Sequence, residues 1–185
     1  YILSKVPRLN GLFSEGTFMA PNNQWYSESL WKNSVDFVAW VQDNFLSEHP
    51  ERRFQGYCLT YALPPGATIE QVIKYGYCSM LLATKYSSSQ NTIGFGFTES
   101  NIPNASLLQL LQKLRSVDMI KPLGDYYKIG STAVYARDFS GGKVLVNPTD
   151  VTYTITLNGS YATIDGTIIS GPLIVYAHTG VILLK

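Results

Sequence analysis

The sequence has few charged residues, few cysteines and few histidines. Only 15% of its 185 residues are charged, the net charge is +1, and Lys and Arg are scattered along the chain. It therefore lacks the basic patch that binds nucleic acid or an anionic membrane surface. The two cysteines form neither a disulfide scaffold nor a cluster with metal-ligand spacing. No apolar run reaches the roughly 20 residues of a membrane-spanning helix. We expect no nucleic acid partner, no membrane span, no metal and no organic cofactor.

Apolar and aromatic residues, in contrast, are abundant. Hydrophobic residues make up 45% of the chain, which is enough for a sizeable core. The 13 tyrosines combine a flat apolar ring with a hydroxyl, which suits stacking on sugars as well as packing in the interior. Packing is the commoner use. The chain begins with Tyr1 instead of Met, so we expect it to be cut from a longer parent.

Three successive segments each predict a strand followed by a helix. The expected strands are 9–16, 54–61 and 91–98. Ser27 is a plausible N-cap of the first helix, whose apolar positions include Leu30 and Phe37. Thr68 and Gln71 have the spacing of a capping box at the second helix, and Asn104 can cap the third. Such repeats indicate a parallel sheet with helices packed on it, and they leave open whether the sheet is open or closed into a barrel.

After residue 120 the pattern changes to short strands separated by turn residues. Ser140-Gly141-Gly142 separates two strands of a hairpin, and Asn158-Gly159 is the strongest short-range indication of another. The remaining breaks are expected at Asp165-Gly166, Gly171-Pro172 and Thr179-Gly180. This pattern predicts an antiparallel module of about seven strands, a small β-sandwich. We place the boundary near residue 120, with one unit over 1–120 and a second over 121–185.

Glu15 is the first candidate for chemistry. It directly follows an apolar strand, and groups at the carboxyl ends of barrel strands face the active site. It is therefore a candidate acid, base or nucleophile, the alternative being a carboxylate that only orders a loop. Glycosidases generally need two carboxylates across the scissile bond. Glu99 follows the third strand and is a substrate-site candidate, although it could simply start a loop.

Three aromatic residues lie where they could line a sugar-binding cleft. Trp25 and Tyr26 are in the loop after the first strand, and Tyr61 ends the second. Packing between loop and sheet is the alternative for all three. His49 and His178 have no nearby nucleophile with a supporting carboxylate, so we expect no catalytic triad.

Four stretches resemble a known family. Residues 121–127 (KPLGDYY), 134–139 (VYARDF) and 142–149 (GKVLVNPT) resemble the tail of glycosyl-hydrolase-like proteins, in which a β-domain follows a (β/α)8 barrel. Residues 11–15 (GLFSE) are similar to a late barrel strand of the same group. The resemblance implies the last three β/α units of a TIM-type barrel, followed by an antiparallel β-sandwich. Because a whole barrel takes roughly 250 residues, the amino-terminal half would belong to the same parent chain or to another chain.

The resemblance also implies a function. It implies hydrolysis of glycosidic bonds in an extracellular polysaccharide, with Glu15 as a catalytic carboxylate and an extracellular or cell-surface location. The rival hypothesis is a non-catalytic carbohydrate-binding or surface-structural protein on a degenerate barrel. A second carboxylate facing Glu15 would separate the two. A third alternative is an inert piece whose exposed sheet edge promotes dimerisation.

Overall fold

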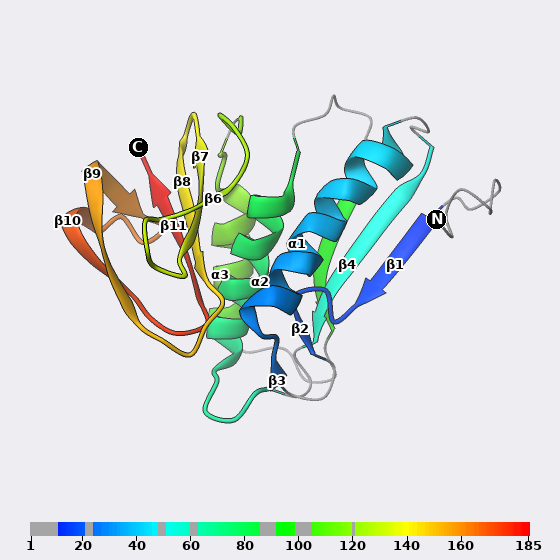
Figure 1. Cartoon of the computed structure of the whole chain (residues 1–185), viewed down its shortest axis with the longest axis horizontal. Coiled ribbons are helices and arrows are strands. Elements are labelled where there is room, and N and C mark those ends of the chain that lie inside the picture. Colours follow the sequence, from blue (N-terminus) through cyan, green and yellow to red (C-terminus); the bar gives the residue numbers. More distant parts are fainter. Residues whose placement is uncertain are drawn as a thin grey trace.

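A parallel sheet and an antiparallel sheet lie on either side of a layer of helices (Figure 1). The structure, a computed structural model, describes residues 11–20, 24–47, 51–59, 63–85, 92–98, 105–119 and 121–185. The parallel sheet consists of β1 (Gly11–Glu15), β4 (Arg53–Leu59) and β5 (Thr92–Thr98), in that order. The helices are α1 (Glu28–Val41), which continues into the π-helical turn η2 (Gln42–Leu46), α2 (Ile69–Ala83) and α3 (Ala105–Ser116). A short pair, β2 (Met19–Ala20) and β3 (Gln24–Trp25), precedes α1.

The three β-α units predicted from the sequence are confirmed. Ser27 caps α1 by accepting a hydrogen bond from the Leu30 amide, and Thr68 caps α2 by accepting one from the Gln71 amide. The apolar face predicted for the first helix is partly wrong, because Leu30 and Phe37 are 53% and 43% exposed. The residues of α1 that are buried are Trp31, Val35, Val38 and Val41.

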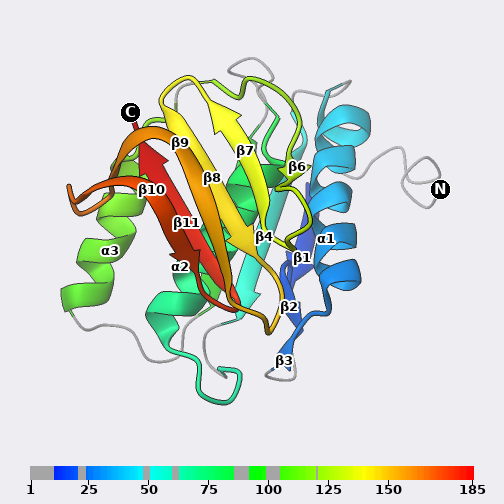
Figure 2. The ribbon, with the colours of Figure 1, turned by 60° about the vertical axis from the view of Figure 1, so that its left-hand side comes forward.

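The antiparallel module is one six-stranded sheet, in the order β10-β9-β11-β8-β7-β6. Its strands are β6 (Tyr127–Lys128), β7 (Tyr135–Phe139), β8 (Gly142–Asn147), β9 (Tyr153–Thr163), β10 (Ile168–Val175) and β11 (Thr179–Leu184). The sheet curls, so that β9 and β10 arch over β11 (Figure 2). The expected sandwich of two sheets is thus a single curled sheet with its own core, formed by Val134, Ala136, Leu145, Ile155, Leu157, Tyr161, Val175 and Leu183.

Three of the predicted turns in this module are wrong, and one of them is Thr179-Gly180, which lies inside β11 directly after the turn at 177–178. β9 continues through Asn158-Gly159 as a bulge, since Leu157 pairs with Gly171 and Ser160 with Ser170, and the buried Leu157 and Tyr161 both belong to the module's core. Gly171-Pro172 lies inside β10, at a shift of register between Ser170 and Gly171. β10 is an edge strand, where the missing N–H of a proline is tolerated. The turns at Ser140-Gly141 and Asp165-Gly166 are confirmed.

Helix α2 is the centre of the molecule. It packs against β11 and β8 on one side and against β4 and β5 on the other. Gly76 permits the approach of β4, because a Cβ there would lie 2.6 Å from the Cys58 sulfur. Gly180 permits the approach of β11, because a Cβ there would lie 2.5 Å from the Lys74 carbonyl oxygen. Both approaches to α2 are thus close, and Cys58 and Cys78 are buried free thiols.

The carboxyl end of α2 is capped from the antiparallel module. The last turn of α2 has no basic residue of its own. Instead the buried Arg137 guanidinium of β7 donates hydrogen bonds to the carbonyls of Leu82, at 2.7 Å, and Thr84. Arg137 also donates through Nε to the Gly124 carbonyl, at 2.9 Å. A cation at this position complements the negative end of the helix dipole and satisfies carbonyls that have no partner within the helix.

Candidate functional site

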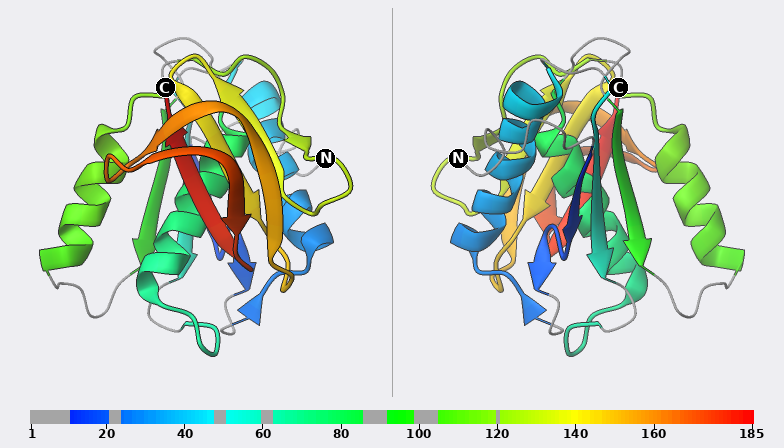
Figure 3. Two further views of the ribbon diagram at one scale, coloured as in Figure 1. Left: turned by 90° about the vertical axis from the view of Figure 1, so that its left-hand side faces the viewer. Right: turned by 90° about the vertical axis from the view of Figure 1, so that its right-hand side faces the viewer.

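Glu15 lies at the carboxyl end of β1, on the face of the parallel sheet opposite to the helices. In register, Glu15 pairs with Tyr57 of β4, and Tyr57 pairs with Gly96 of β5. Their neighbours Phe54 and Cys58 alternate to the other face and are buried in the helix layer. Glu15 is exposed, and the right-hand view of Figure 3 looks onto this face, which no described element covers.

The surroundings of Glu15 are aromatic and polar. The rings of Phe13 and Tyr57 are 5.1 Å apart, and Phe13 is 64% exposed. Glycines make room on β5, since a Cβ at Gly94 would lie 1.7 Å from the Gln55 amide oxygen. Among the described side chains of this face, Glu15 is the one carboxylate. The sequence thus predicted the position of Glu15, while its neighbours follow from the register between strands.

The chain turns sharply directly after Glu15. Gly16 has a φ of 68°, a left-handed conformation that a side chain would strain. Thr17 then returns to β4, where its amide donates to the Tyr57 carbonyl at 2.9 Å and its hydroxyl accepts from the Tyr57 amide at 3.0 Å. The Glu15 backbone is therefore held on both sides at the edge of the sheet.

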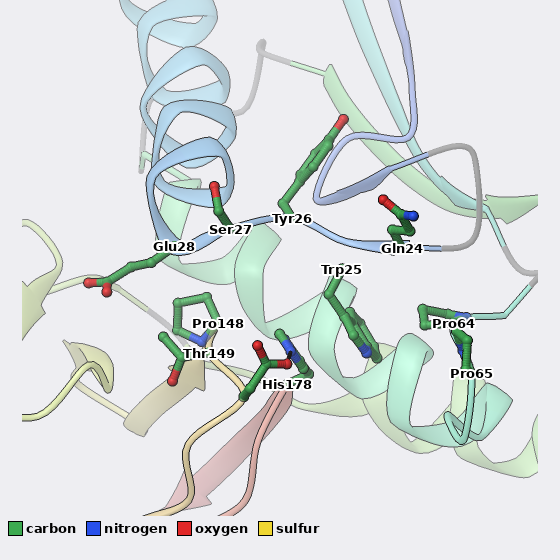
Figure 4. A pocket seen from close by; sticks show the side chains of 11 residues that line it. Gln24, Trp25, Tyr26, Ser27, Glu28, Pro64, Pro65, Pro148, Thr149 and His178 are labelled. Atoms are coloured by element: carbon green, nitrogen blue, oxygen red, sulfur yellow. Dashed lines mark hydrogen bonds and ion pairs between the residues drawn. The ribbon is translucent and has the colours of Figure 1, made fainter.

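Trp25 and Tyr26 line a different cavity, shown in Figure 4. This cavity, the junction pocket, has a volume of about 520 Å³ and lies where the loops of the β-α units meet two turns of the antiparallel module. It is lined by Gln24, Trp25, Tyr26, Ser27, Glu28, Pro64, Pro65, Pro148, Thr149, Asp150 and His178. Glu15 does not line it, so the structure does not bring Glu15 and Trp25 into one cavity.

Tyr26 lines the junction pocket and also contacts the turn next to Glu15. Its backbone belongs to the loop that leads into α1, and its hydroxyl donates to the Gly16 carbonyl at 3.1 Å, next to Glu15. Burial, and in second place the neighbouring Cys58, raises the pKa of the Tyr26 hydroxyl, which therefore stays protonated as a donor. The other two predicted substrate-site residues, Tyr61 and Glu99, lie outside the described residues.

His178 is the residue of the junction pocket that sequence reasoning missed. Its ring stacks on the Trp25 indole with 4.6 Å between centroids and 6° between planes. Its Nε2 lies 2.7 Å from the Asp150 carboxylate, whose side chain is 95% exposed. Burial lowers the pKa of His178, against the opposing effect of Asp150, so the ring is neutral near pH 7. Trp25 and His178 come from distant parts of the chain, and no local pattern joins them.

Glu28, at the start of α1, is a second carboxylate at the edge of the junction pocket. It accepts hydrogen bonds from Lys128, at 2.8 Å, and from the Tyr135 hydroxyl, at 2.6 Å. These two bonds lower the pKa of Glu28, which is therefore ionised at neutral pH. Because Lys128 and Tyr135 belong to the antiparallel module, Glu28 is above all a link between α1 and that module.

The described residues contain no group of three or more His, Cys, Asp or Glu side chains that could hold a metal ion. None of the helices in the described ranges has both the length and the apolar composition of a membrane span.

No protein-family model and no curated protein matches this chain. Among solved structures, it aligns with a hypothetical maltooligosyl trehalose synthase from Sulfolobus tokodaii at 12% identity and a TM-score of 0.40. It also aligns with Gan42B, a GH42 β-galactosidase, at 10% identity and a TM-score of 0.26. The alignments cover 89% and 95% of this chain, but 27% and 32% of the two enzymes. These distant neighbours are glycoside hydrolases or related enzymes, and TM-scores this low do not establish a shared fold.

Proposed function

We propose that this chain is the carboxyl-terminal part of a carbohydrate-acting (β/α)8 barrel protein with its β module, and that Glu15 is a catalytic carboxylate of a glycoside hydrolase. The observation that supports this proposal is the position of Glu15. It lies at the carboxyl end of a parallel strand and on the face without helices, beside Tyr57. In a closed barrel this face is the interior, and its carboxyl-terminal rim is where barrel enzymes place their catalytic groups.

The order and covering of the strands support the same proposal. β1, β4 and β5 are adjacent in space in the order in which they occur in the sequence, and α1 and α2 connect them on one face. This is the arrangement of consecutive units in a barrel wall, where helices lie outside and strands inside. The remaining strands would be supplied by the amino-terminal half, from the same parent chain or from another chain.

A glycosidase also needs a second carboxylate. In retaining enzymes the two carboxyl groups are roughly 5–5.5 Å apart, and in inverting enzymes roughly 6.5–9.5 Å. In this proposal the partner of Glu15 comes from Glu99 or from the missing barrel strands. Glu15 then acts as acid/base or nucleophile on a polysaccharide outside the cell or at its surface.

The test is sugar release from a panel of polysaccharides by the complete protein that contains this chain. Glu15→Gln removes the titratable carboxyl group while keeping the shape of the side chain, and we expect it to lower turnover by about 10³-fold or more. The matched control is Glu70→Gln, on the exposed surface of α2 where Glu70 pairs with Lys74. It should leave turnover unchanged. Full activity of Glu15→Gln would remove Glu15 from the catalytic machinery.

The second candidate function is a non-catalytic carbohydrate-binding protein on a degenerate barrel. The observation that favours it is the single carboxylate among the described side chains of the Glu15 face. In that case the complete protein would be retained by an immobilised polysaccharide and would release no sugar. Retention without release, equal in the normal protein and in Glu15→Gln, would decide for the binding protein.

A further inference from the structure

The junction pocket is a cavity between segments that are far apart in the sequence, and Glu15 does not line it. Three parts of the chain form it: the segment 24–28 before α1, the Pro64-Pro65 turn before α2, and the turns of the antiparallel module at 148–150 and His178 (Figure 4). Its volume of about 520 Å³ is within the range of small-molecule sites. Contacts between units of a fold are also a frequent place for such sites.

The turn that carries His178 is held in a conformation that costs free energy. His178 has a φ of 46°, the one positive value among the described residues other than glycine. Its amide donates to the Thr149 carbonyl at 3.2 Å, and the Gln71 amide group of α2 donates to the carbonyls of Ala177 and His178, both at 3.2 Å. Residues kept in such sparsely populated conformations by their surroundings cluster at ligand sites.

The apolar wall of the pocket is flat. The Trp25 indole stacks on His178 and makes a T-shaped contact with Tyr75, whose ring centroid is 5.0 Å away. Trp25 is nevertheless only half-buried, and its remaining surface lines the pocket together with Pro64 and Pro65. A rigid indole plane with proline rings beside it offers an apolar surface that fits the C–H face of a sugar ring.

The charged groups of the pocket are carboxylates, which accept hydrogen bonds. Asp150 has one oxygen on the His178 ring and an almost fully exposed side chain, so its carboxylate has free lone pairs for hydroxyl donors. Among the lining residues that the structure describes, none is Lys or Arg. The carboxylates of Asp150 and Glu28 therefore disfavour an anionic ligand. Lys128 neutralises Glu28, so Asp150 is the main acceptor of the pocket, and its exposed carboxylate suits the hydroxyl groups of a neutral ligand.

We propose that the junction pocket is a second carbohydrate-binding site, which takes a neutral sugar ring with its apolar face on Trp25 and its hydroxyls on Asp150. His178 positions this site by stacking on Trp25 and by donating a hydrogen bond to Asp150. The site goes beyond the proposed hydrolysis at Glu15 and does not depend on it.

The test is a titration of this chain with neutral oligosaccharides (maltohexaose, cellohexaose and β-1,4-galactohexaose), followed by NMR of the His178 imidazole and the Trp25 indole. We expect at least one of the sugars to shift both signals in a saturable manner. Asp150→Asn should weaken this binding about tenfold, because a charged acceptor becomes a neutral one. Asp150 is nearly fully exposed, so this variant should fold normally. Trp25→Ala should abolish the binding.

Two controls separate this proposal from the one on Glu15. Asp165→Asn changes an exposed carboxylate on the β9–β10 turn of the same module and should leave the sugar affinity unchanged. Glu15→Gln should also leave it unchanged, whatever its effect on sugar release. The proposal is overturned if no sugar shifts the two signals at about 10 mM, which lies above the affinities typical of specific sites. It is equally overturned if binding is undiminished in Asp150→Asn and Trp25→Ala, or if tetramethylammonium binds there and the sugars do not.

Discussion

The two sheets of this molecule differ in how their faces are covered. The antiparallel sheet curls around its own core, which includes Leu145 and Leu157, and packs the buried residues of its other face on α2. The parallel sheet packs one face on the helices and exposes Phe13 on the other. Parallel sheets are normally covered on both faces. The difference shows that the antiparallel module completes its own interior, whereas the described part of the parallel sheet does not cover the face on which Glu15 lies.

The largest effect on this comparison is expected from Arg137, which ties the antiparallel sheet to the end of α2 in the helix layer. Arg137→Ala would leave the carbonyls of Leu82, Thr84 and Gly124 without their donor. We expect it to lower the free energy of unfolding by about 3–5 kcal/mol, since buried acceptors lose a charged partner. Urea denaturation followed by circular dichroism measures this loss.

Arg137→Lys keeps a charge but not the planar fork of the guanidinium, so it should recover only part of the stability. A loss below about 1 kcal/mol in Arg137→Ala, a size typical of a surface substitution, would mean that the antiparallel sheet is held on α2 without this cap.

Two glycines, Gly180 and Gly76, allow the antiparallel and the parallel sheet to approach α2, and substituting each one tests the packing of one sheet. Gly180→Ala would drive a Cβ against the Lys74 carbonyl of α2, and we expect a cost of about 2–3 kcal/mol. Gly76→Ala would meet the Cys58 sulfur, which is a softer obstacle. Since alanine also favours the helix by about 1 kcal/mol, its net cost should be smaller. Thermal unfolding of both variants shows which substitution lowers the melting temperature more.

Gly124→Ala is the matched control, because a Cβ at Gly124 would meet no atom within 4 Å. It should leave the melting temperature unchanged. If Gly180→Ala were as neutral as Gly124→Ala, the antiparallel sheet would not lie against α2 as closely as the structure has it.

The smallest effect is expected on the exposed face of the parallel sheet. Phe13→Ala removes an exposed ring and its contact with Tyr57, so the free energy of unfolding should fall by about 1 kcal/mol or less. The comparison is Leu145→Ala in the core of the antiparallel module, which should cost about 2–5 kcal/mol. Equal losses in the two variants, measured by denaturation of this chain, would show that the Phe13 face is covered in solution.

The parts of the fold that the sequence predicted correctly depend on local chemistry. Ser27 and Thr68 cap the helices that follow them because capping needs only a side-chain oxygen and an amide three residues later. The turn predicted at Asn158-Gly159 was wrong because its outcome depends on tertiary packing. The dipeptide is compatible with a turn, but burial of Leu157 and Tyr161 in one core keeps the strand continuous, and such a tertiary effect has no local signature.

The candidate site divides in the same way. The place of Glu15 at the end of a strand was predicted because it is a local property of an apolar run. The neighbourhood of Trp25 and His178 was not, because it depends on the last strands folding back onto α2. A lone histidine beside a turn gives no indication of an aromatic partner from a distant loop. Only the observation that a non-glycine residue has a positive φ draws attention to it, and that requires coordinates.

The position of β11 has a consequence for synthesis of the protein. β11 follows β8, β9 and β10 in the sequence, yet in the sheet it lies between β9 and β8, and it packs on α2. The contact of Gln71 with His178 spans 107 residues, and contacts of such long range form slowly. While the polypeptide is still being made, β8 and β9 have no strand between them, and the part of α2 that contacts β11 is uncovered. On the ribosome, therefore, this part of the helix layer stays open to the solvent until β11 is made and inserts.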